Sequence, residues 1–315
     1  MTVALSILYV IAGLVLLERS SDAFVDGSAM IARRFKVSPF IIGMVIIGFG
    51  TSAPELCVSL MAGLGGKANL SLGNAYGSCV FNISAILGVT AAIHTLRVKR
   101  DVALFAGLGL AVIAAASMLL TVDHVITRLE AMILLIGFIL FFPVYCYFNR
   151  ESATGDASKT DKRFRAWEAT LKLAVGLVVL VGSSQLLVMG AVELARSMGV
   201  SELMIGLTVV AVGTSLPELA AAIQSARRGE AEFVLGNIIG SNLFNMLAVV
   251  GIASSFNGAK GYSSNVTMRD LPAMILTSLL IAVFGRNGRI SRMEGLAWMA
   301  IFVFYMALTI YQEIL

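Results

Sequence analysis

Charged residues are scarce in this sequence: Asp, Glu, Lys and Arg make up 13% of its 315 residues, whereas hydrophobic residues make up 58%. Soluble domains carry about 25% charged residues, so this deficit argues against a soluble protein. The mean hydropathy is +0.90, and apolar runs of about 20 residues recur, which is the length that crosses the ~30 Å hydrocarbon core as a helix. The sequence therefore predicts an all-α membrane protein.

Cysteine and histidine are also rare, with three and two residues respectively. Cys57, Cys79 and Cys146 lie in apolar segments and show no CxxC or His spacing, so they predict neither a disulfide framework nor a zinc site. No P-loop, GxSxG or HExxH motif is present. We therefore expect no cofactor and no enzymatic activity. The net charge of +4 does not indicate nucleic-acid binding, because most Lys and Arg fall in short loops.

The apolar runs predict ten transmembrane helices. A polar stretch at 149–166 separates them into two sets of five, and we expect it to be a cytoplasmic linker loop. The predicted domains are a first five-helix repeat at 1–148 and a second at 167–315. The approximate spans are 2–17, 40–62, 69–93, 102–121, 129–148, 168–188, 202–226, 231–254, 271–284 and 294–313.

The cations predict the orientation of these helices. Loops after the odd-numbered spans carry sixteen Lys and Arg residues, whereas the opposite side carries five. Cytoplasmic loops carry the excess of Lys and Arg in membrane proteins. The odd-numbered loops are therefore predicted to be cytoplasmic, and both termini are predicted to lie outside.

A shift of 163 residues superimposes the two halves. GTSAPEL at 50–56 falls on GTSLPEL at 213–219, and GNAYGSCVFN at 73–82 falls on GNIIGSNLFN at 236–245. Without a gap, 31 of the 76 positions from 13 to 88 are identical to their repeats. Each half has an odd number of spans, so the second must insert inverted relative to the first. Inverted repeats build secondary transporters, whose substrate site lies at the membrane midplane where the repeats meet.

The first motif predicts a broken helix that gathers oxygen atoms. Thr51 and Ser52 precede Glu55 by four and three residues, so the three side chains share a face of a helix. Pro54 lacks an N–H, so we expect carbonyls near Gly48 to be freed or tilted away from the helix ladder. Such a break is tolerated at membrane depth only where it is buried or lines a cavity. The second copy supplies the same set: Thr214, Ser215, Glu218 and the carbonyl near Ala211.

The second motif adds a hydroxyl and an amide on one helical face, because Ser78 and Asn82 are four residues apart. Gly73 and Gly77 have the same spacing, which lets two membrane helices approach closely. Ser241, Asn245, Gly236 and Gly240 repeat the pattern. Together the two halves predict a cage of oxygen atoms that holds two carboxylates.

A cage of this kind suits hard cations. Ca²⁺ takes about six to eight oxygen ligands, and no His or Cys cluster favours zinc or copper. Two carboxylates in a membrane also need a compensating charge. One Ca²⁺ would supply it, and so would two Na⁺, with room for a third at neutral oxygens. We therefore expect Ca²⁺ and Na⁺ as transported ions in a lipid bilayer, with no obligatory protein partner.

These paired motifs resemble those of the Ca²⁺/cation antiporter superfamily, specifically prokaryotic Na⁺/Ca²⁺ exchangers. The resemblance covers nearly the whole chain. It implies ten helices in a prokaryotic plasma (inner) membrane, first and sixth helices that slide past the rest, and exchange of three Na⁺ for one Ca²⁺. It also implies that Glu55 and Glu218 are the principal Ca²⁺ ligands. The further cation ligands that it implies are Thr51, Ser52, Ser78, Asn82, Thr214, Ser215, Ser241 and Asn245.

The sequence departs from the family pattern in two places. Some members have Asp where this chain has Asn82 or Asn245, so the site has no third carboxylate and a proton-binding role there is not expected. Cys79 stands where the second repeat has Asn242, a common family residue. The sequence therefore leaves undecided whether packing or Na⁺ affinity at that position follows the family pattern.

Two alternatives to Na⁺/Ca²⁺ exchange stay open. The coupling ion could be H⁺ or K⁺, or the exported ion another divalent cation. An intramembrane enzyme could use Glu55 and Glu218 as an acid/base pair, although an arranged nucleophile and base would be needed.

Three acidic residues follow the first apolar run at intervals of four, namely Glu18, Asp22 and Asp26. They predict either an acidic vestibule that attracts cations or a solvated face of a helix extension.

Overall fold

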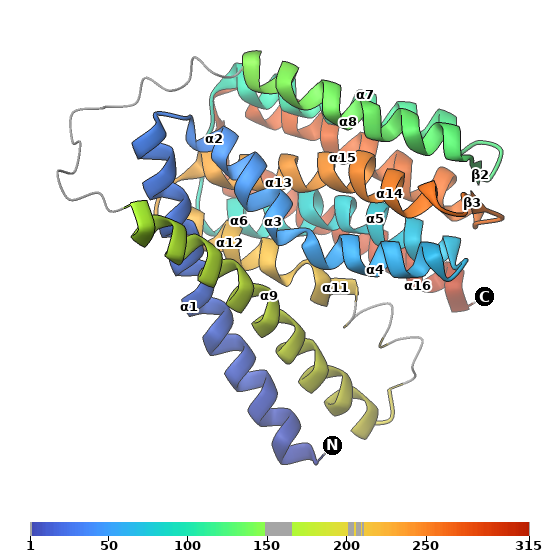
Figure 1. The fold of residues 1–315 in the computed structure, drawn as a ribbon, viewed down its shortest axis with the longest axis horizontal. Coiled ribbons are helices and arrows are strands. Elements are labelled where there is room, and N and C mark those ends of the chain that lie inside the picture. Colours follow the sequence, from blue (N-terminus) through green and yellow to red (C-terminus); the bar gives the residue numbers. More distant parts are fainter. Residues whose placement is uncertain (1, 149–165, 201–204, 206–208, 210, 315) are drawn as a thin grey trace.

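The chain is almost entirely helical in a computed structural model, which describes residues 2–148, 166–200, 205, 209 and 211–314 (Figure 1). The predicted linker at 149–166 lies outside these residues except for its last position. In the first half the helices are α1 (Val3–Phe35), α2 (Pro39–Ile42), α3 (Phe49–Thr51), α4 (Ala53–Leu64), α5 (Ala68–Phe81), α6 (Gly88–Ile93), α7 (Arg100–Leu120) and α8 (Arg128–Phe148), with π-helices η1 (Gly43–Gly48) and η2 (Asn82–Leu87). In the second half they are α9 (Ala166–Ser197), α11 (Ala211–Thr214), α12 (Leu216–Arg227), α13 (Ala231–Leu243), α14 (Val250–Ser255), α15 (Leu271–Gly285) and α16 (Arg292–Ile314), with π-helices η5 (Phe244–Val249) and η6 (Val266–Asp270).

The sequence repeat is also a repeat of elements. The bounds of α12 are those of α4 shifted by the 163 residues that align the motifs. A π-helix follows α5 in the first half and α13 in the second. The two halves therefore break and bend their helices at matching places.

Two short strand pairs join the halves. Strand β1 (Leu96–Arg97) pairs antiparallel with β4 (Arg289–Ile290), and β2 (Val125–Ile126) pairs antiparallel with β3 (Ala259–Lys260). In the order of elements, β3 is the counterpart of β1, and β4 is the counterpart of β2. The first strand of each half thus pairs with the second strand of the other half.

Seven helical segments of the described residues are long and apolar enough to cross a membrane, and an eighth is a bent pair formed by Pro39–Thr51 and Ala53–Leu64. The short span predicted at 271–284 is longer in the structure, because η6 and α15 join into one segment, Val266–Asn287. Two predicted spans, 129–148 and 202–226, include residues or side chains outside the described part. The structure therefore confirms a polytopic helical protein but not the count of ten.

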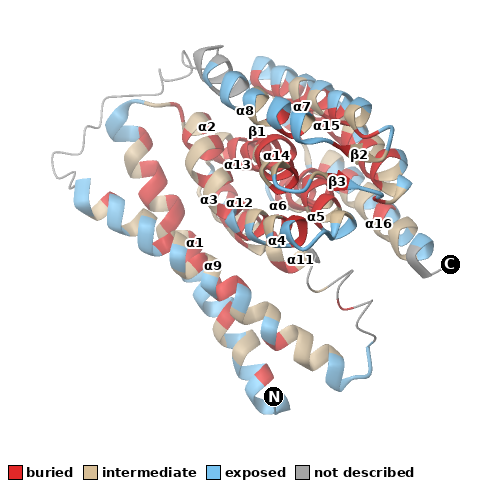
Figure 2. Ribbon diagram, turned by 45° about the vertical axis from the view of Figure 1, so that its right-hand side comes forward, coloured by how far each residue is buried: buried red, intermediate tan, exposed pale blue. Residues whose placement is uncertain are grey.

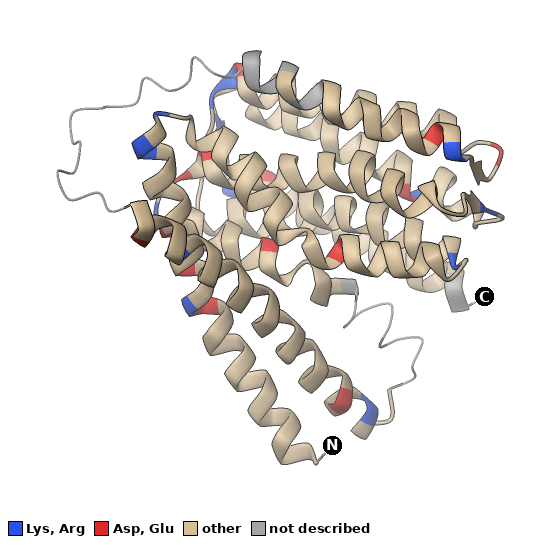
Figure 3. Cartoon of the chain, in the orientation of Figure 1, with Lys and Arg blue, Asp and Glu red and all other residues tan. Residues whose placement is uncertain are grey.

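Burial divides the helices into a centre and a periphery (Figure 2). The central segments are α5–α6 and α13–α14, and every residue of α13 except Glu232 is buried. The outer helices α1, α7, α8, α9 and α16 carry many exposed large apolar side chains, which suits a lipid surrounding. Most Lys and Arg gather at the two ends of the helical bundle (Figure 3).

Helices α1 and α9 lie side by side and extend away from the other helices (Figures 1 and 2). Glycines allow their close approach: a Cβ on Gly13 would lie 2.8 Å from the Cβ of Leu187, and one on Gly176 would lie 2.8 Å from the backbone nitrogen of Phe24. Gly13 and Gly176 are repeat counterparts. Small residues of this kind let membrane helices pack backbone to backbone, so α1 and α9 form a closely packed pair.

Candidate cation site

Both copies of the first motif break a helix at the serine. Ser52 (φ −81°, ψ 10°) separates α3 from α4, and Ser215 (φ −92°, ψ 10°) separates α11 from α12. The helix axis bends by 46° at Ser52. Pro54 and Pro217 lie in the first turns of α4 and α12, where a missing N–H costs no helical hydrogen bond. The predicted broken helix is therefore confirmed, and its break lies two residues before each proline.

The two motifs meet through reciprocal hydrogen bonds. The Ser52 hydroxyl donates to Oε1 of Glu218 across 2.8 Å, and the Ser215 hydroxyl donates to Oε1 of Glu55 across 2.8 Å. All four side chains are fully buried. Each glutamate also lies in the first turn of its helix, where the positive end of the helix dipole favours a carboxylate.

The second oxygen of each carboxylate has no hydrogen-bond partner among the described residues. Oε2 of Glu55 and Oε2 of Glu218 are both buried in this state. Leaving a buried carboxylate oxygen uncompensated is costly, since buried charges need a partner of opposite sign. The pair of free oxygens is therefore suited to bind a cation.

The Gly48 carbonyl is not free in this structure, contrary to our expectation. It accepts hydrogen bonds from the Ser52 backbone N–H at 3.2 Å and from the Ser241 hydroxyl at 3.0 Å. The Thr51 hydroxyl donates to the Ile47 carbonyl at 2.9 Å. The helix ladder thus persists up to the break, and a ligand role for Gly48 stays a prediction.

The remaining predicted residues lie on α5, α11, η2 and η5. Ser78 lies on α5, and the Ser215 hydroxyl lies 3.5 Å from its hydroxyl. Thr214 and Ala211 are the last and first residues of α11, directly before the break at Ser215. Asn82 and Asn245 are buried, one at the start of η2 and the other in η5.

In the part of the chain that the structure describes, three π-helices border the site: η1 ends at Gly48, η2 begins at Asn82 and η5 contains Asn245. A π-helix widens the helix ladder locally and occurs often at functional sites. We did not predict these segments, because no residue pattern in them distinguishes a π-helix from an apolar α-helix.

Two asparagines of the second motif, which we did not predict as site residues, donate hydrogen bonds to the backbone carbonyls of the two glutamates. The side-chain amide of Asn74 donates to the Glu55 backbone carbonyl at 3.2 Å, and that of Asn237 donates to the Glu218 carbonyl at 3.1 Å. The Thr51 hydroxyl also lies 3.4 Å from Oδ1 of Asn237. The sequence could have identified both asparagines, because they occupy the same position in the two GNxxGS motifs.

Asp22 and Asp26 on α1 form ion pairs between helices, which neither of our two interpretations predicted, whereas Glu18 stays mostly exposed, as expected for a solvated face. Asp22 pairs with Arg228 at 2.6 Å and accepts a hydrogen bond from Gln224, while Asp26 pairs with Arg228 at 3.1 Å and with Lys172 at 2.7 Å. These contacts join α1 to α9 and to the end of α12. Asp22 and Asp26 are therefore interhelical ion-pair partners.

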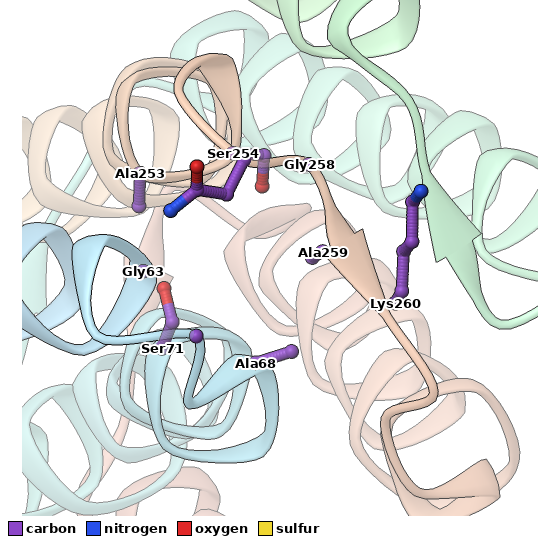
Figure 4. Close-up of a pocket in the computed structure, with 10 residues that line it drawn as sticks. Gly63, Ala68, Ser71, Ala253, Ser254, Gly258, Ala259 and Lys260 are labelled. Carbon is purple, nitrogen blue, oxygen red and sulfur yellow. The ribbon is translucent and has the colours of Figure 1, made fainter.

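A small pocket of ≈ 150 Å³ lies apart from this site, between the end of α4 and the segment around β3 (Figure 4). Its lining includes Ser71, Ser254 and Lys260 but none of the predicted cation ligands. Among the described residues, no group of three or more His, Cys, Asp or Glu side chains could hold a metal ion. The charged part of the candidate site is therefore the pair Glu55 and Glu218.

The chain is similar to proteins of one family. The family model described as sodium/calcium exchanger protein matches residues 5–147 and again 168–311. A putative antiporter, CaxA of Alkalimonas amylolytica, is 39% identical over 95% of this chain and 96% of its own. Sodium/calcium exchanger MaX1 of Methanosarcina acetivorans is 28% identical over 98% of this chain and 99% of its own. A solved structure of the sodium-calcium exchanger NCX_Mj superimposes with a TM-score of 0.86 at 30% identity, covering 97% of this chain and 99% of that one.

Proposed function

This chain belongs to the sodium/calcium exchanger protein family, and from that premise we propose that it exchanges three Na⁺ for one Ca²⁺ by alternating access. The observation that carries this proposal is the reciprocal pairing of Ser52 with Glu218 and of Ser215 with Glu55. It gathers two buried carboxylates, each with a free oxygen, where two broken helices meet.

Competition for the same oxygens would couple the two ions. Ca²⁺ binds between Glu55 and Glu218, since a divalent cation compensates both charges. Na⁺ ions occupy overlapping positions, with added oxygens from Thr51, Thr214 and the Ser and Asn side chains of the second motif. Burying the two carboxylates without a bound cation costs free energy, so the protein changes conformation only when cations occupy the site. Three Na⁺ for one Ca²⁺ moves one net charge in each cycle, so transport responds to voltage by about 2.3 kcal/mol per 100 mV.

We further propose ten spans arranged as two inverted halves. The strand pairing supports the inversion: β1 follows the third span and pairs with β4, which precedes the tenth. Its counterpart β3, which follows the eighth span, lies at the other end of α15 and pairs with β2. Equivalent connections of the two halves therefore lie at opposite ends of the molecule.

The distribution of cations supports an inner-membrane protein with both termini outside and odd-numbered loops in the cytoplasm. The named relatives from bacteria and archaea are consistent with a prokaryotic location.

For alternating access we propose that α1 and α9 move as one unit past the other helices. Their close packing through Gly13 and Gly176 supports a rigid pair. The pair extends away from the bundle in Figures 1 and 2, and its ion pairs to Arg228 would have to break as it moves.

Flux in proteoliposomes tests the function. Vesicles loaded with Na⁺ should take up Ca²⁺ when the outside contains K⁺ or choline. Uptake should rise when valinomycin lets external K⁺ enter and sets the interior positive, because the proposed exchange carries one net positive charge out of the vesicle in each cycle. A pH gradient alone, or a K⁺ gradient alone, should drive none. Ca²⁺ uptake driven equally by protons would replace Na⁺ with H⁺ as the coupling ion. Turnover of a peptide or lipid without ion flux would favour an intramembrane enzyme.

A further inference from the structure

The two halves differ at one pair of positions beside the site. The Asn82 side-chain amide donates to Oδ1 of Asn242 across 3.0 Å. The repeat places Asn245 in the position of Asn82 and Cys79 in the position of Asn242. A thiol has no amide oxygen, so the second half cannot reproduce the Asn82–Asn242 hydrogen bond.

Asn245 is left without a partner as a result. Its side chain is fully buried, and neither its Nδ2 nor its Oδ1 has a hydrogen bond among the described residues. In contrast, Asn82 uses its Nδ2 on Asn242, which directs its unpartnered Oδ1 away from that contact. A hydrogen bond therefore fixes the orientation of the Asn82 amide, whereas none fixes that of the Asn245 amide.

Cys79 itself is tied to the same neighbour by weaker contacts. Its sulfur lies 3.7 Å from the Asn242 carbonyl, and the Asn242 amide donates to the Cys79 carbonyl at 3.2 Å. These contacts hold α5 against α13, but they leave no acceptor for Asn245.

We propose that Cys79 is a positioning residue that lowers cation affinity by leaving the Asn245 amide unfixed. This inference rests on the proposed exchange function. An amide oxygen that must be immobilised when an ion binds contributes less to affinity than one already held by a hydrogen bond. Three Na⁺ ions need more oxygen ligands than two carboxylates supply, so the effect falls more on Na⁺ than on Ca²⁺.

The test is Cys79→Asn, which replaces the thiol with an amide of similar size. Asn at position 79 would accept from Asn245 as Asn242 accepts from Asn82. We expect the KM for Na⁺ to fall about two- to tenfold with kcat at or below the wild-type value, and the KM for Ca²⁺ to change less. Equilibrium binding of ²²Na⁺ to the purified protein should tighten by the same factor. An unchanged Na⁺ KM in a variant that folds would overturn the inference.

Two further variants separate positioning from packing. Cys79→Ala removes the thiol without adding any hydrogen-bond acceptor, and it should leave the Na⁺ KM within about twofold of wild type. Asn242→Cys removes the partner of Asn82 and should raise the Na⁺ KM, which a purely structural role of Cys79 would not predict. Should Cys79→Ala lower the KM as much as Cys79→Asn, the amide mechanism is wrong.

A double-mutant cycle identifies the group through which residue 79 acts. In an Asn245→Ala background, Cys79→Asn should no longer change Na⁺ binding, since the amide that it would hold is gone. A full effect in that background would contradict the proposal. Wild-type protein that neither binds nor exchanges Na⁺ would instead refute the proposed function itself, so the two failures are distinguishable.

Discussion

The Ser52 hydroxyl donates a 2.8 Å hydrogen bond to the carboxylate of Glu218, a residue 166 positions further along the chain. The equivalent serine of the second half, Ser215, binds Glu55 in the same way. Each half therefore carries one carboxylate but relies on the other half to hold it. A site built in this way exists only when the two repeats are packed together, so its geometry is sensitive to any movement between them.

Replacing either glutamate by glutamine should abolish Ca²⁺ exchange while the fold is retained. Glu55→Gln or Glu218→Gln removes one of the two charges that compensate a divalent cation, and an amide of the same shape preserves the packing. The measurement is Na⁺-driven ⁴⁵Ca²⁺ uptake into liposomes, with gel filtration to check the fold. Glu168→Gln changes a half-exposed carboxylate on α9, outside the site, and should leave uptake unchanged. Wild-type exchange by either site variant would refute the site assignment.

Ser52→Ala and Ser215→Ala should weaken cation binding to similar extents. Each removes a hydrogen bond to a buried carboxylate, which is worth about 1.5–3 kcal/mol, or about a 10- to 100-fold increase in KM. The repeat predicts that neither serine dominates. Initial rates at varied Na⁺ and Ca²⁺ would measure both constants.

The matched control for the serines is Thr90→Ala. Thr90 is also fully buried, but its hydroxyl donates only to the Ile86 carbonyl of its own helix segment. Its removal should leave both KM values unchanged. A large effect of Ser52→Ala together with wild-type behaviour of Ser215→Ala would show that the reciprocal contacts are not equivalent.

Much of the fold and of the site could be predicted because the same polar residues recur at the same spacing in both halves of the sequence. Matching GTSxPE and GNxxGS motifs, with the helix periodicity, identify Ser52, Glu55 and their counterparts as one group. The position of the helix break also follows from local chemistry, since proline is tolerated in a first turn and not in a helix interior. These features depend on residues close together in sequence.

The contacts between halves could not be predicted, because they depend on how the halves pack. Spacing places Ser52 and Glu55 on one face, yet each serine binds the glutamate of the other half. The contact of Asp22 with Arg228 likewise joins positions 206 residues apart, although the sequence showed only an acidic stripe. The Gly48 carbonyl, expected to be free, accepts from Ser241 for the same reason.

Gly240→Ala should destabilise the protein. A Cβ at this position would lie 2.1 Å from the Met44 carbonyl oxygen of η1, so two backbones would have to separate. Overpacking of this kind costs about 1–3 kcal/mol or more. We expect a lower melting temperature in a fluorescence-based assay and reduced Ca²⁺ uptake. Gly182→Ala, at an exposed position of α9 where no described atom lies within 4 Å of the new Cβ, should leave both unchanged.

Ion pairs connect the α1–α9 pair to the end of α12. Arg228 is one-quarter exposed and binds both Asp22 and Asp26. Arg228→Gln should weaken the contact between α1 and the end of α12 by about 1–2 kcal/mol. This corresponds to about a 5- to 30-fold increase in the equilibrium constant for separation of the two elements. Hydrogen–deuterium exchange should then be faster in the second half of α1 and around residues 227–230.

Its neighbour provides the control. Arg227 lies 3.7 Å from Glu18, and both side chains are more than half exposed, so this pair contributes little. Arg227→Gln loses the same charge from the same end of α12 but should not change the exchange rates. If α1 and α9 separate from α12 during transport, Arg228→Gln should change kcat and Arg227→Gln should not. The KM values for Na⁺ and Ca²⁺ should stay unchanged in both variants. Equal effects of the two variants would mean that the net charge at the end of α12 determines the result, and not the contact of Arg228 with Asp22 and Asp26.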